Sequence, residues 1–267
     1  MDLTMTRVHF TATYFMEPQN PITVQLIGAG GTGSQVLTAL GKMNHAMVAL
    51  GHPGLHVTVW DNDTVSTANL GRQLFAQAEV GLAKSVALIN RVNRFFGTNW
   101  KAQNRRYDRA DHYLAGVNGT ANIIISCVDT VSARFEIADI LKGLNMKDQQ
   151  RDRPYYWLDF GNSQKTGQVI LSTIGKVKQP ESMKYSPVDQ LPLITEEWGD
   201  ALRQSEVEDN TPSCSLAEAL EKQDLFINST LANMGSALLW SLFRNGMTEN
   251  RGFFLNLSDF RTQPVKV

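Results

Sequence analysis

The stretch that decides the fold is Thr23-Val-Gln-Leu-Ile-Gly28-Ala-Gly30-Gly31-Thr-Gly33, in which a short β-prone run leads directly into a cluster of glycines. Hydrophobic residues then recur at steps of three and four, a spacing that predicts a helix, at Val36, Leu37, Leu40, Met43 and Met47. His56–Trp60 is typical of a second strand, which ends at Asp61. The first 61 residues therefore predict a strand, a glycine turn, a helix and a strand, the βαβ unit of a parallel sheet.

The same alternation continues along the chain. Helical spacing is present around residues 82–96 and again from Ser132, and three runs are typical of strands, at residues 123–128, 155–160 and 168–173. These elements predict an α/β fold with a Rossmann-like, doubly wound and mostly parallel sheet.

The two ends and one long segment do not follow this alternation. Residues 1–20 are turn-rich and predict a short hairpin or arm, and residues 175–213 have no clear period and carry four prolines. A segment this long without regular structure is usually functional or mobile. A helix from about 215 to 244 and a final strand at 252–257 complete the prediction.

The composition is that of an ordinary globular protein: 267 residues, 42% hydrophobic, 19% charged and a net charge of −1. This near-neutral balance disfavours nucleic acid as a partner. We expect no membrane segment, because no apolar run approaches about 18 residues, and no secretory leader in the first ten residues. Two cysteines, Cys127 and Cys214, are too few for a disulfide framework or a four-thiolate zinc site. We therefore expect a cytoplasmic protein without zinc.

The pattern Gly28-x-Gly30-x-x-Gly33 lies between a predicted strand and a predicted helix, where glycines let the backbone approach a phosphate group closely. Asp61, at the end of the next strand, is placed to hold ribose hydroxyl groups. Taken alone, this pattern most often indicates NAD or FAD binding. Two plainer alternatives stay open here: a turn that merely needs glycine, and an aspartate that caps the next turn.

A second stretch distinguishes ATP from a dinucleotide. Between Asp61 and Lys84 the chain carries Arg72 and Lys84, with the hydrogen-bonding side chains of Asn69 and Gln73. A dinucleotide needs no cluster of cations beyond the second strand, whereas a triphosphate needs its charge neutralised where pyrophosphate leaves. The sequence therefore favours ATP, unless Lys84 is a solvated helix residue and Asp63 only caps a turn.

The run Asp61-x-Asp63-x-Val-x-x-x-Asn69-Leu-x-Arg72-Gln73, followed by Gly-x-x-Lys84, resembles the ATP site of the superfamily of ThiF, MoeB and ubiquitin-activating enzymes. A second block, Ser126-Cys-Val-Asp129 with Ala133-Arg134, is similar to the strand-end aspartate of that family and the helix that follows it. The resemblance covers residues 22 to 175 well and the rest loosely. It implies a single adenylation domain over residues 1–267, with an ATP-binding core at 21–175, a crossover loop at 176–213 and a C-terminal helix and strand at 214–267.

The resemblance also implies a role for each matching residue. Gly28, Gly30, Gly31 and Gly33 would form the nucleotide turn. Asp61 would hold ribose, and Asp63 belongs to the same nucleotide-binding set. Asn69, Arg72 and Gln73 would contact phosphates, Lys84 would stabilise charge on the α- and β-phosphates, and Asp129 would carry Mg²⁺. The implied reaction is ATP-dependent activation of a carboxylate, the C-terminus of a small ubiquitin-like protein, as an acyl-adenylate.

Cys214 lies in Thr211-Pro-Ser-Cys214-Ser-Leu, which resembles the Pro-x-Cys-Thr segment that carries the thioester cysteine of ubiquitin-activating enzymes. At the start of the predicted helix its thiol pKa would be lowered, so that a thiolate could attack the adenylate. The alternative is a buried small hydrophobic residue. Cys127 lies inside a predicted buried strand, and we expect no catalytic role for it.

Residues 212–228 resemble the ThiF-related proteins of a bacterial cassette known as PRTRC. That resemblance implies three partners: a ubiquitin-like protein, a conjugating-enzyme-like protein and a JAB-type peptidase. Relatives are commonly homodimers. The chain departs from the family in two ways: it lacks the paired Cys-x-x-Cys zinc motifs of many MoeB-like relatives, and Arg7 does not match the arginine that some dimeric relatives lend to the neighbouring active site.

Three alternatives remain from the sequence alone. An NAD(P)-dependent oxidoreductase would share the glycine turn but leave Arg72, Lys84 and Asp129 unexplained. A tRNA-modifying adenylating relative would share the ATP site but need a basic face for RNA. An inactive scaffold subunit would not need to retain the three charged residues.

Overall fold

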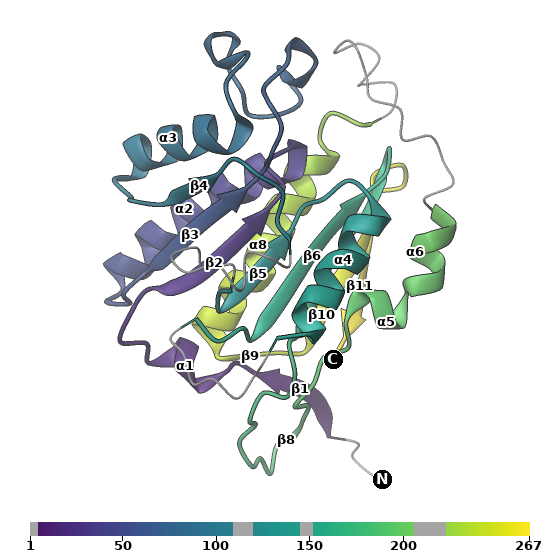
Figure 1. Ribbon diagram of the computed structural model, residues 1–267. Coiled ribbons are helices and arrows are strands. Elements are labelled where there is room, and N and C mark those ends of the chain that lie inside the picture. Colours follow the sequence, from purple (N-terminus) through teal and green to yellow (C-terminus); the bar gives the residue numbers. More distant parts are fainter. Residues whose placement is uncertain (1–4, 109–119, 145–151, 206–222) are drawn as a thin grey trace.

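The hydrophobic run before the glycine cluster forms β2 (Ile22–Ile27), the strand around which the main sheet of this computed structural model is built (Figure 1). The structure describes residues 5–108, 120–144, 152–205 and 223–267. Within them, eight strands form one sheet in the order β11-β10-β7-β6-β5-β2-β3-β4. The other strands of this sheet are β3 (Leu55–Trp60), β4 (Lys101–Gln103), β5 (Ile123–Ser126), β6 (Tyr156–Asn162), β7 (Thr166–Thr173), β10 (Asn250–Asn256) and β11 (Arg261–Lys266).

The sheet has a parallel half and an antiparallel half. Strands β4, β3, β2, β5 and β6 pair in parallel, whereas β7, β10 and β11 are antiparallel to their neighbours. The chain leaves β2 toward β3 on one side, and β5 pairs with its other side. In an open α/β sheet this reversal of strand order opens a crevice at the carboxyl ends of the strands, where ligands bind. The doubly wound, mostly parallel sheet that we predicted is confirmed.

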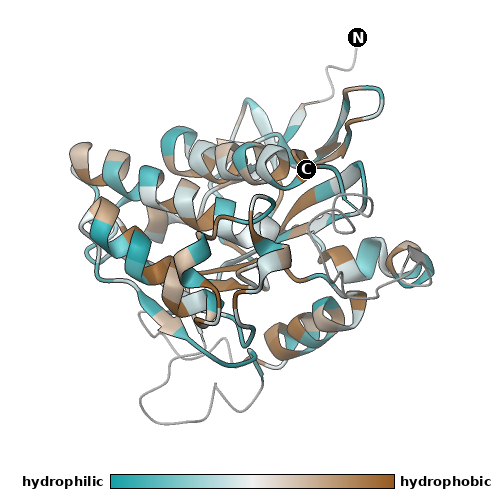
Figure 2. Ribbon diagram, turned by 90° about the horizontal axis from the view of Figure 1, so that it is seen from above, coloured by the Kyte–Doolittle hydropathy of each residue, from teal (hydrophilic) through white to brown (hydrophobic). Residues whose placement is uncertain are grey.

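Helices cover both faces of the sheet. The hydrophobic sides of α2 (Gly31–Ala49), α3 (Lys84–Phe96) and α8 (Ile227–Asn245) pack into one core with β2, whereas α4 (Val131–Lys142) packs into a second core on the other face. Figure 2 shows brown and teal sides alternating along these helices. In α3 the buried residues recur with helical spacing, at Ala87, Leu88, Ile89 and Val92.

The N-terminal segment is not a hairpin. Strand β1 (Thr6–Phe10) joins a separate three-stranded sheet, in parallel with β8 (Tyr185–Pro187) and antiparallel to β9 (Met247–Thr248), and the short helix α1 (Thr13–Met16) follows. His9 fastens this sheet to the main one, because its ring contacts the hydroxyl group of Tyr156 on β6 at 3.0 Å and the carbonyl of Val188 at 2.7 Å.

Three further predictions needed correction. Residues 223–226 are not helical, so the last long helix begins at Ile227 rather than near 215; Cys214, with residues 206–222, lies outside the described residues. The strand at β10 is not the last, because the chain turns back as β11. Residues 175–205 include β8, α5 (Ile194–Glu197) and α6 (Gly199–Ser205). The segment between β3 and α3, which we call the polar loop, contains two short 3-10 helices, η1 (Thr67–Asn69) and η2 (Gln77–Glu79).

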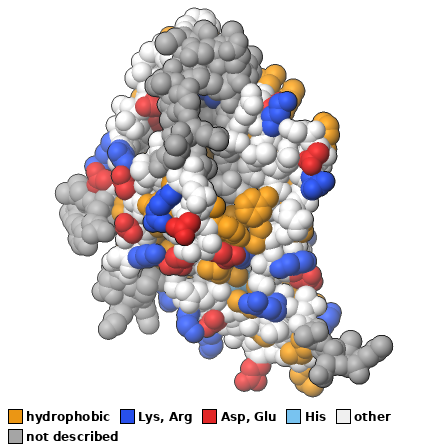
Figure 3. Space-filling model, turned by 90° about the vertical axis from the view of Figure 1, so that its right-hand side faces the viewer, with side chains coloured by type: hydrophobic (Ala, Val, Ile, Leu, Met, Phe, Trp, Pro, Cys, Tyr) orange, Lys and Arg blue, Asp and Glu red, His pale blue; other side chains and the backbone are white. Residues whose placement is uncertain are grey.

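The side of the molecule that carries α5, α6 and β11 presents a group of hydrophobic side chains among charged ones (Figure 3). Here β10 exposes Phe254, whose ring packs edge-on against Trp198 at 5.5 Å between ring centroids. In the part of the chain that the structure describes, no helix is long and apolar enough to cross a membrane.

Candidate functional site

The glycine turn between β2 and α2 is closely packed at two positions where only glycine fits. Gly28 has φ +93°, and a Cβ atom there would lie 2.6 Å from the carbonyl oxygen of Cys127. A Cβ atom on Gly33 would lie 1.9 Å from the carbonyl oxygen of Gly28. Side chains at either position would push the turn away from β5 or from the first turn of α2, so these two glycines set the shape of the turn.

The other two glycines of the turn face polar side chains. A Cβ atom on Gly30 would lie 4.0 Å from Nε2 of Gln73, and one on Gly31 would lie 2.6 Å from the amide nitrogen of Asn228. Among the described residues, no side chain caps the N-terminus of α2. The first turn of this 19-residue helix therefore directs its N–H groups and positive dipole end toward the turn, an arrangement suited to a phosphate group.

Asp61 is bonded to the turn itself. Its Oδ2 accepts a hydrogen bond of 2.6 Å from the backbone N–H of Ala29, and its Oδ1 accepts one of 2.8 Å from the N–H of Asp63. Burial raises the pKa of Asp61, with these two bonds opposing the shift. Asp61 therefore caps the turn that follows β3, as the plainer alternative from the sequence had it. Each carboxylate oxygen retains a further lone pair, so Asp61 can also accept a bond from a ribose hydroxyl group.

Lys84 is the first residue of α3, and its side chain is only 9% exposed. Its Nζ lies 2.8 Å from Oδ2 of Asp63, whose side chain is 62% exposed. The alternative that Lys84 is a solvated helix residue is therefore wrong. Asp63 holds a buried cation beside the site, a role that its position in the sequence did not reveal.

Arg72 and Gln73 lie where the polar loop meets the turn. Arg72 donates from Nη1 to Oε1 of Gln223 at 2.7 Å, and burial lowers its pKa. The Nε atom of Arg72 and the Oε1 atom of Gln73 are buried and have no hydrogen-bond partner among the described residues. Buried polar atoms are nearly always satisfied in proteins, so two such atoms beside a glycine turn indicate a polar ligand.

The side chain of Asn69 forms hydrogen bonds within its own loop. Its Oδ1 accepts hydrogen bonds from the backbone N–H of Ser66 at 2.8 Å and from the hydroxyl group of Ser66 at 3.1 Å. This arrangement stabilises the 3-10 turn that precedes Arg72. The geometry shows that Asn69 shapes the loop, whereas its predicted contact with a phosphate stays a prediction.

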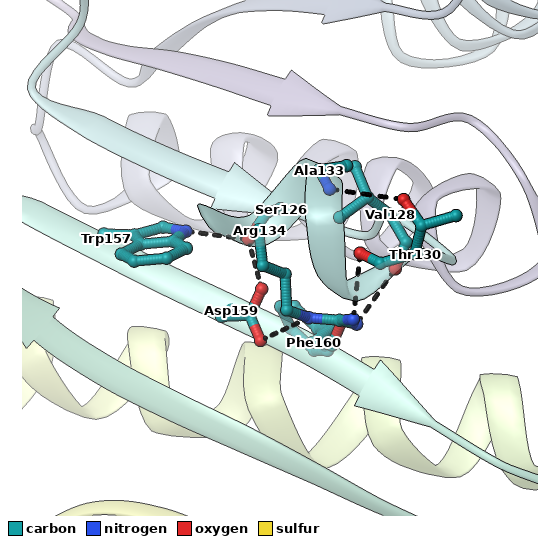
Figure 4. A network of polar contacts seen from close by, with 8 residues as sticks. All are labelled: Ser126, Val128, Thr130, Ala133, Arg134, Trp157, Asp159 and Phe160. Carbon is teal, nitrogen blue, oxygen red and sulfur yellow. Dashed lines mark hydrogen bonds and ion pairs between the residues drawn. The ribbon is translucent and has the colours of Figure 1, made fainter. Parts of the chain in front are cut away.

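Asp129 is exposed in the loop that follows β5. Cys127, in the same loop, contacts the glycine turn, and Arg134 of α4 holds the loop from behind (Figure 4). No group of three or more His, Cys, Asp and Glu side chains with metal-binding geometry is present in the described ranges. Mg²⁺ is usually bound by one or two carboxylates together with substrate phosphates and water, so a single exposed carboxylate in the loop beside the glycine turn fits this ion. Burial raises the pKa of the Cys127 thiol well above its ordinary value, which disfavours the reactive thiolate. The absence of a catalytic role for Cys127 stays a prediction.

One group of site residues was not identified from the sequence. Asn228, on α8, accepts hydrogen bonds of 2.8 Å at Oδ1 from Thr32 and from Asn162, and its Nδ2 donates to Gln223 at 2.9 Å. It is 2% exposed and forms one wall of the turn at Gly31. Gln223 and Asn228 lie in the segment that resembles PRTRC proteins, but that resemblance assigns them no role, and Thr32 lies nearly 200 positions away in the chain.

The sequence model of the ThiF family matches residues 13–263. The chain belongs to the ThiF family. Crystal structures with the same fold include PaaA, with 16% sequence identity and a TM-score of 0.57 over 93% of this chain, and E. coli MccB, with 14% identity and a TM-score of 0.58 over 95%. E. coli MccB has also been solved with ATP, with a TM-score of 0.54, 14% identity and coverage of 95% of this chain and 66% of that one. Among curated proteins, none matches this chain significantly.

The chain spans about two thirds of the length of the solved structures that it resembles. It spans 64% of the PaaA chain and 64% of the MccB chain. At these identities the similarity establishes the fold. The activity has to be argued from the residues around the glycine turn.

Proposed function

We propose that this ThiF family member is an ATP-dependent adenylyltransferase that activates a carboxylate as an acyl-adenylate. The observation that carries the proposal is the set of groups around one glycine turn: the buried cation Lys84, Arg72 with its unpartnered Nε, and Gln73 with its unpartnered Oε1. A dinucleotide would bind at the turn and Asp61 but would leave these groups without a ligand. A triphosphate uses all of them.

In the proposed reaction, a carboxylate oxygen of the substrate attacks the α-phosphorus of ATP. The new oxygen–phosphorus bond forms as the bond to the bridging oxygen of the β-phosphate breaks, and pyrophosphate leaves with the electron pair. The products are the acyl-adenylate and pyrophosphate. Catalysis consists of alignment and charge neutralisation, so no general base is required.

Each residue has a place in this step. The turn from Gly28 to Gly33 would receive the phosphates, Asp61 would hold the ribose, and Arg72 with Lys84 would stabilise the charge that develops as pyrophosphate leaves. Asp129 would hold Mg²⁺, which would neutralise phosphate charge when it is bound. Asn69 and Gln73 complete the proposed phosphate contacts, Asn69 mainly through the shape of the loop.

The proposed substrate is the C-terminal carboxylate of a small ubiquitin-like protein. The resemblance of residues 212–228 to the ThiF-related proteins of PRTRC cassettes supports this choice, and it also supports a conjugating-enzyme-like partner. E. coli MccB, which shares this fold, has been solved in complex with MccA. We further propose that Cys214 accepts the acyl group as a thioester with release of AMP, and that the protein acts as a homodimer.

The test is to incubate the full chain with ATP, Mg²⁺ and the ubiquitin-like protein encoded nearest its gene, and to measure pyrophosphate–ATP exchange and the intact mass of the partner. Adenylation adds one AMP unit to the partner. A partner whose C-terminal carboxylate is amidated is the matched control and should give no exchange. Arg72→Ala and Asp129→Ala should each abolish exchange without loss of the fold, and full exchange in both variants would refute the assigned site.

Two other results would support the alternatives. Tight NAD binding without ATP binding would support the oxidoreductase, and ATP turnover stimulated by tRNA would support the RNA-modifying enzyme.

A further inference from the structure

A buried ion pair lies directly behind the loop that carries Asp129. Arg134 on α4 is 5% exposed, and its Nε donates to Oδ2 of Asp159 on β6 at 3.1 Å. Asp159 is 1% exposed, and its Oδ1 accepts a bond of 2.5 Å from the hydroxyl group of Ser126. Trp157 donates to that same hydroxyl group at 2.7 Å. Figure 4 shows this chain of contacts from β6 to the guanidinium group.

The remaining donors of Arg134 point at the backbone on either side of Asp129. Nη2 donates to the carbonyl of Val128 at 2.9 Å, and Nη1 donates to the carbonyl of Thr130 at 3.3 Å. Nη2 also donates to the carbonyl of Phe160 on β6 at 2.9 Å. One rigid, planar group therefore ties the carbonyls of the two residues that flank Asp129 to the neighbouring strand.

This placement restricts the direction of an exposed carboxylate. The side chain of Asp129 is exposed, whereas the carbonyls of the residues on either side of it are held from the side away from solvent. Thr130 adds to this restraint, because its Oγ1 accepts a bond of 3.3 Å from the N–H of Ala133 at the start of α4. Partners that orient a metal-binding side chain commonly change metal affinity by about 10- to 100-fold when they are removed.

We propose that Arg134, held by Asp159, is a positioning residue that aims the Asp129 carboxylate at the metal ion of a metal–nucleotide complex. This inference rests on the proposed function, since it assumes that Asp129 binds the ion. A purely structural role for the ion pair would stabilise the fold without changing metal affinity in the folded protein.

The experiment measures metal binding directly on the full chain. Mn²⁺, which shares with Mg²⁺ a preference for octahedral oxygen ligands, is titrated in the presence of a non-hydrolysable methylene analogue of ATP, and free Mn²⁺ is followed by electron paramagnetic resonance. In Arg134→Lys the charge is kept but the planar fork is lost. The dissociation constant for Mn²⁺ should rise about tenfold or more, while binding of the analogue without metal should not change.

The matched control is Arg106→Lys. Arg106 also contacts α4, through an exposed ion pair with Glu136, but has no contact with the loop of Asp129 among the described residues. The Mn²⁺ affinity of the Arg106→Lys variant should equal that of the wild type. Thermal unfolding is recorded for every variant. If Arg134→Lys does not fold, Asp159→Asn decides the question, because asparagine keeps an acceptor for Nε and should weaken Mn²⁺ binding to a smaller extent.

Two results would overturn the proposal while leaving the proposed function intact: a folded Arg134→Lys or Asp159→Asn variant with the Mn²⁺ dissociation constant of the wild type, or an equal loss in Arg106→Lys. A wild-type protein that binds neither the analogue nor nucleotide-dependent Mn²⁺ would contradict the proposed function, and this inference with it.

Discussion

Lys84 and Asp63 form an ion pair of 2.8 Å between a buried ammonium group and an exposed carboxylate. We therefore expect Asp63 to hold the ammonium group in place and Lys84 to act on the bound nucleotide. The carboxylate is largely solvated, but it is the partner of a buried cation, so its removal would leave that charge unpaired. The ammonium group is fixed close to Asp61, whose carboxylate is bonded to the glycine turn.

We expect Lys84→Met to lower the rate of pyrophosphate–ATP exchange by about 100-fold, the typical cost of removing one group that stabilises transition-state charge. Asp63→Asn, which keeps the shape of the partner but removes its charge, should lower the melting temperature, because the buried ammonium group of Lys84 loses its carboxylate. Exchange assays and thermal unfolding test both variants. Unchanged exchange in a folded Lys84→Met protein would remove Lys84 from the proposed site.

The contact between Arg72 and Gln223 offers a second test. In Gln223→Glu a carboxylate would replace the amide oxygen 2.7 Å from Nη1 of Arg72. It would repel phosphate and compete with it for the guanidinium group, so KM for ATP should rise about tenfold, which corresponds to about 1.4 kcal/mol. Gln19→Glu makes the same charge change on an exposed residue that precedes β2, at the opposite end of that strand from the glycine turn. A Gln223→Glu variant that matches this control would show that Arg72 does not contact phosphate.

Two glycines with positive φ form a natural pair of variants. Gly28 has φ +93° and faces the carbonyl oxygen of Cys127, whereas Gly51 has φ +84° and nothing within 4 Å of its missing Cβ atom. Gly51→Ala should cost only backbone strain, about 1–2 kcal/mol. Gly28→Ala adds a steric clash that displaces the turn, and we expect it to lose ATP binding, measured by calorimetry. Normal ATP affinity in Gly28→Ala would mean that the turn is not the phosphate site.

Stability should fall below neutral pH because of His9. Burial lowers the pKa of this histidine below its ordinary value of about 6.5, although the carbonyl of Val188 and the charge of Asp189 oppose the shift. Below pH 6.5 the unfolded chain binds a proton at this position that the folded chain does not. The free energy of unfolding therefore decreases as the pH falls from about 6.5 toward the lowered pKa. His9→Gln should flatten this part of the pH profile in denaturant titrations, and an unchanged slope would assign the effect to other groups.

Cys214→Ala separates the two proposed chemical steps. Adenylation of the ubiquitin-like partner should continue, because the carboxylate attacks ATP without help from a thiol. A thiol-sensitive adduct between enzyme and partner, seen by intact mass and on non-reducing gels, should disappear. Loss of adenylation in this variant would instead give Cys214 a structural role.

Much of the fold could be predicted because its signals are local. The strand before Gly28, the spacing from Val36 to Met47 and the strand ending at Trp60 each lie within a few residues. The predictions were wrong where pairing is distant. Strand β1 joins β8 and β9, which are remote in sequence, and β11 has exposed polar residues that give no alternating pattern.

The same division applies to the site. Arg72, Gln73 and Lys84 follow the glycine turn closely enough to form a readable spacing, although the pairing of Lys84 with Asp63 was not evident. Gln223 and Asn228 reach the turn only because α8 packs along α2, and neither residue type nor spacing marks them. Local patterns can reveal the groups that carry charge, whereas the residues that fix those groups depend on how the whole chain folds.

The position of Asn228 has a consequence for dissecting the protein. A shortened polypeptide that ends before α8 would keep every residue of the recognisable nucleotide motif, from Gly28 to Asp129. It would nevertheless lose the amide that bridges Thr32 and Asn162 and covers Gly31. Possession of the motif is therefore not equivalent to possession of a complete site in this chain, since one side of the glycine turn is provided by α8.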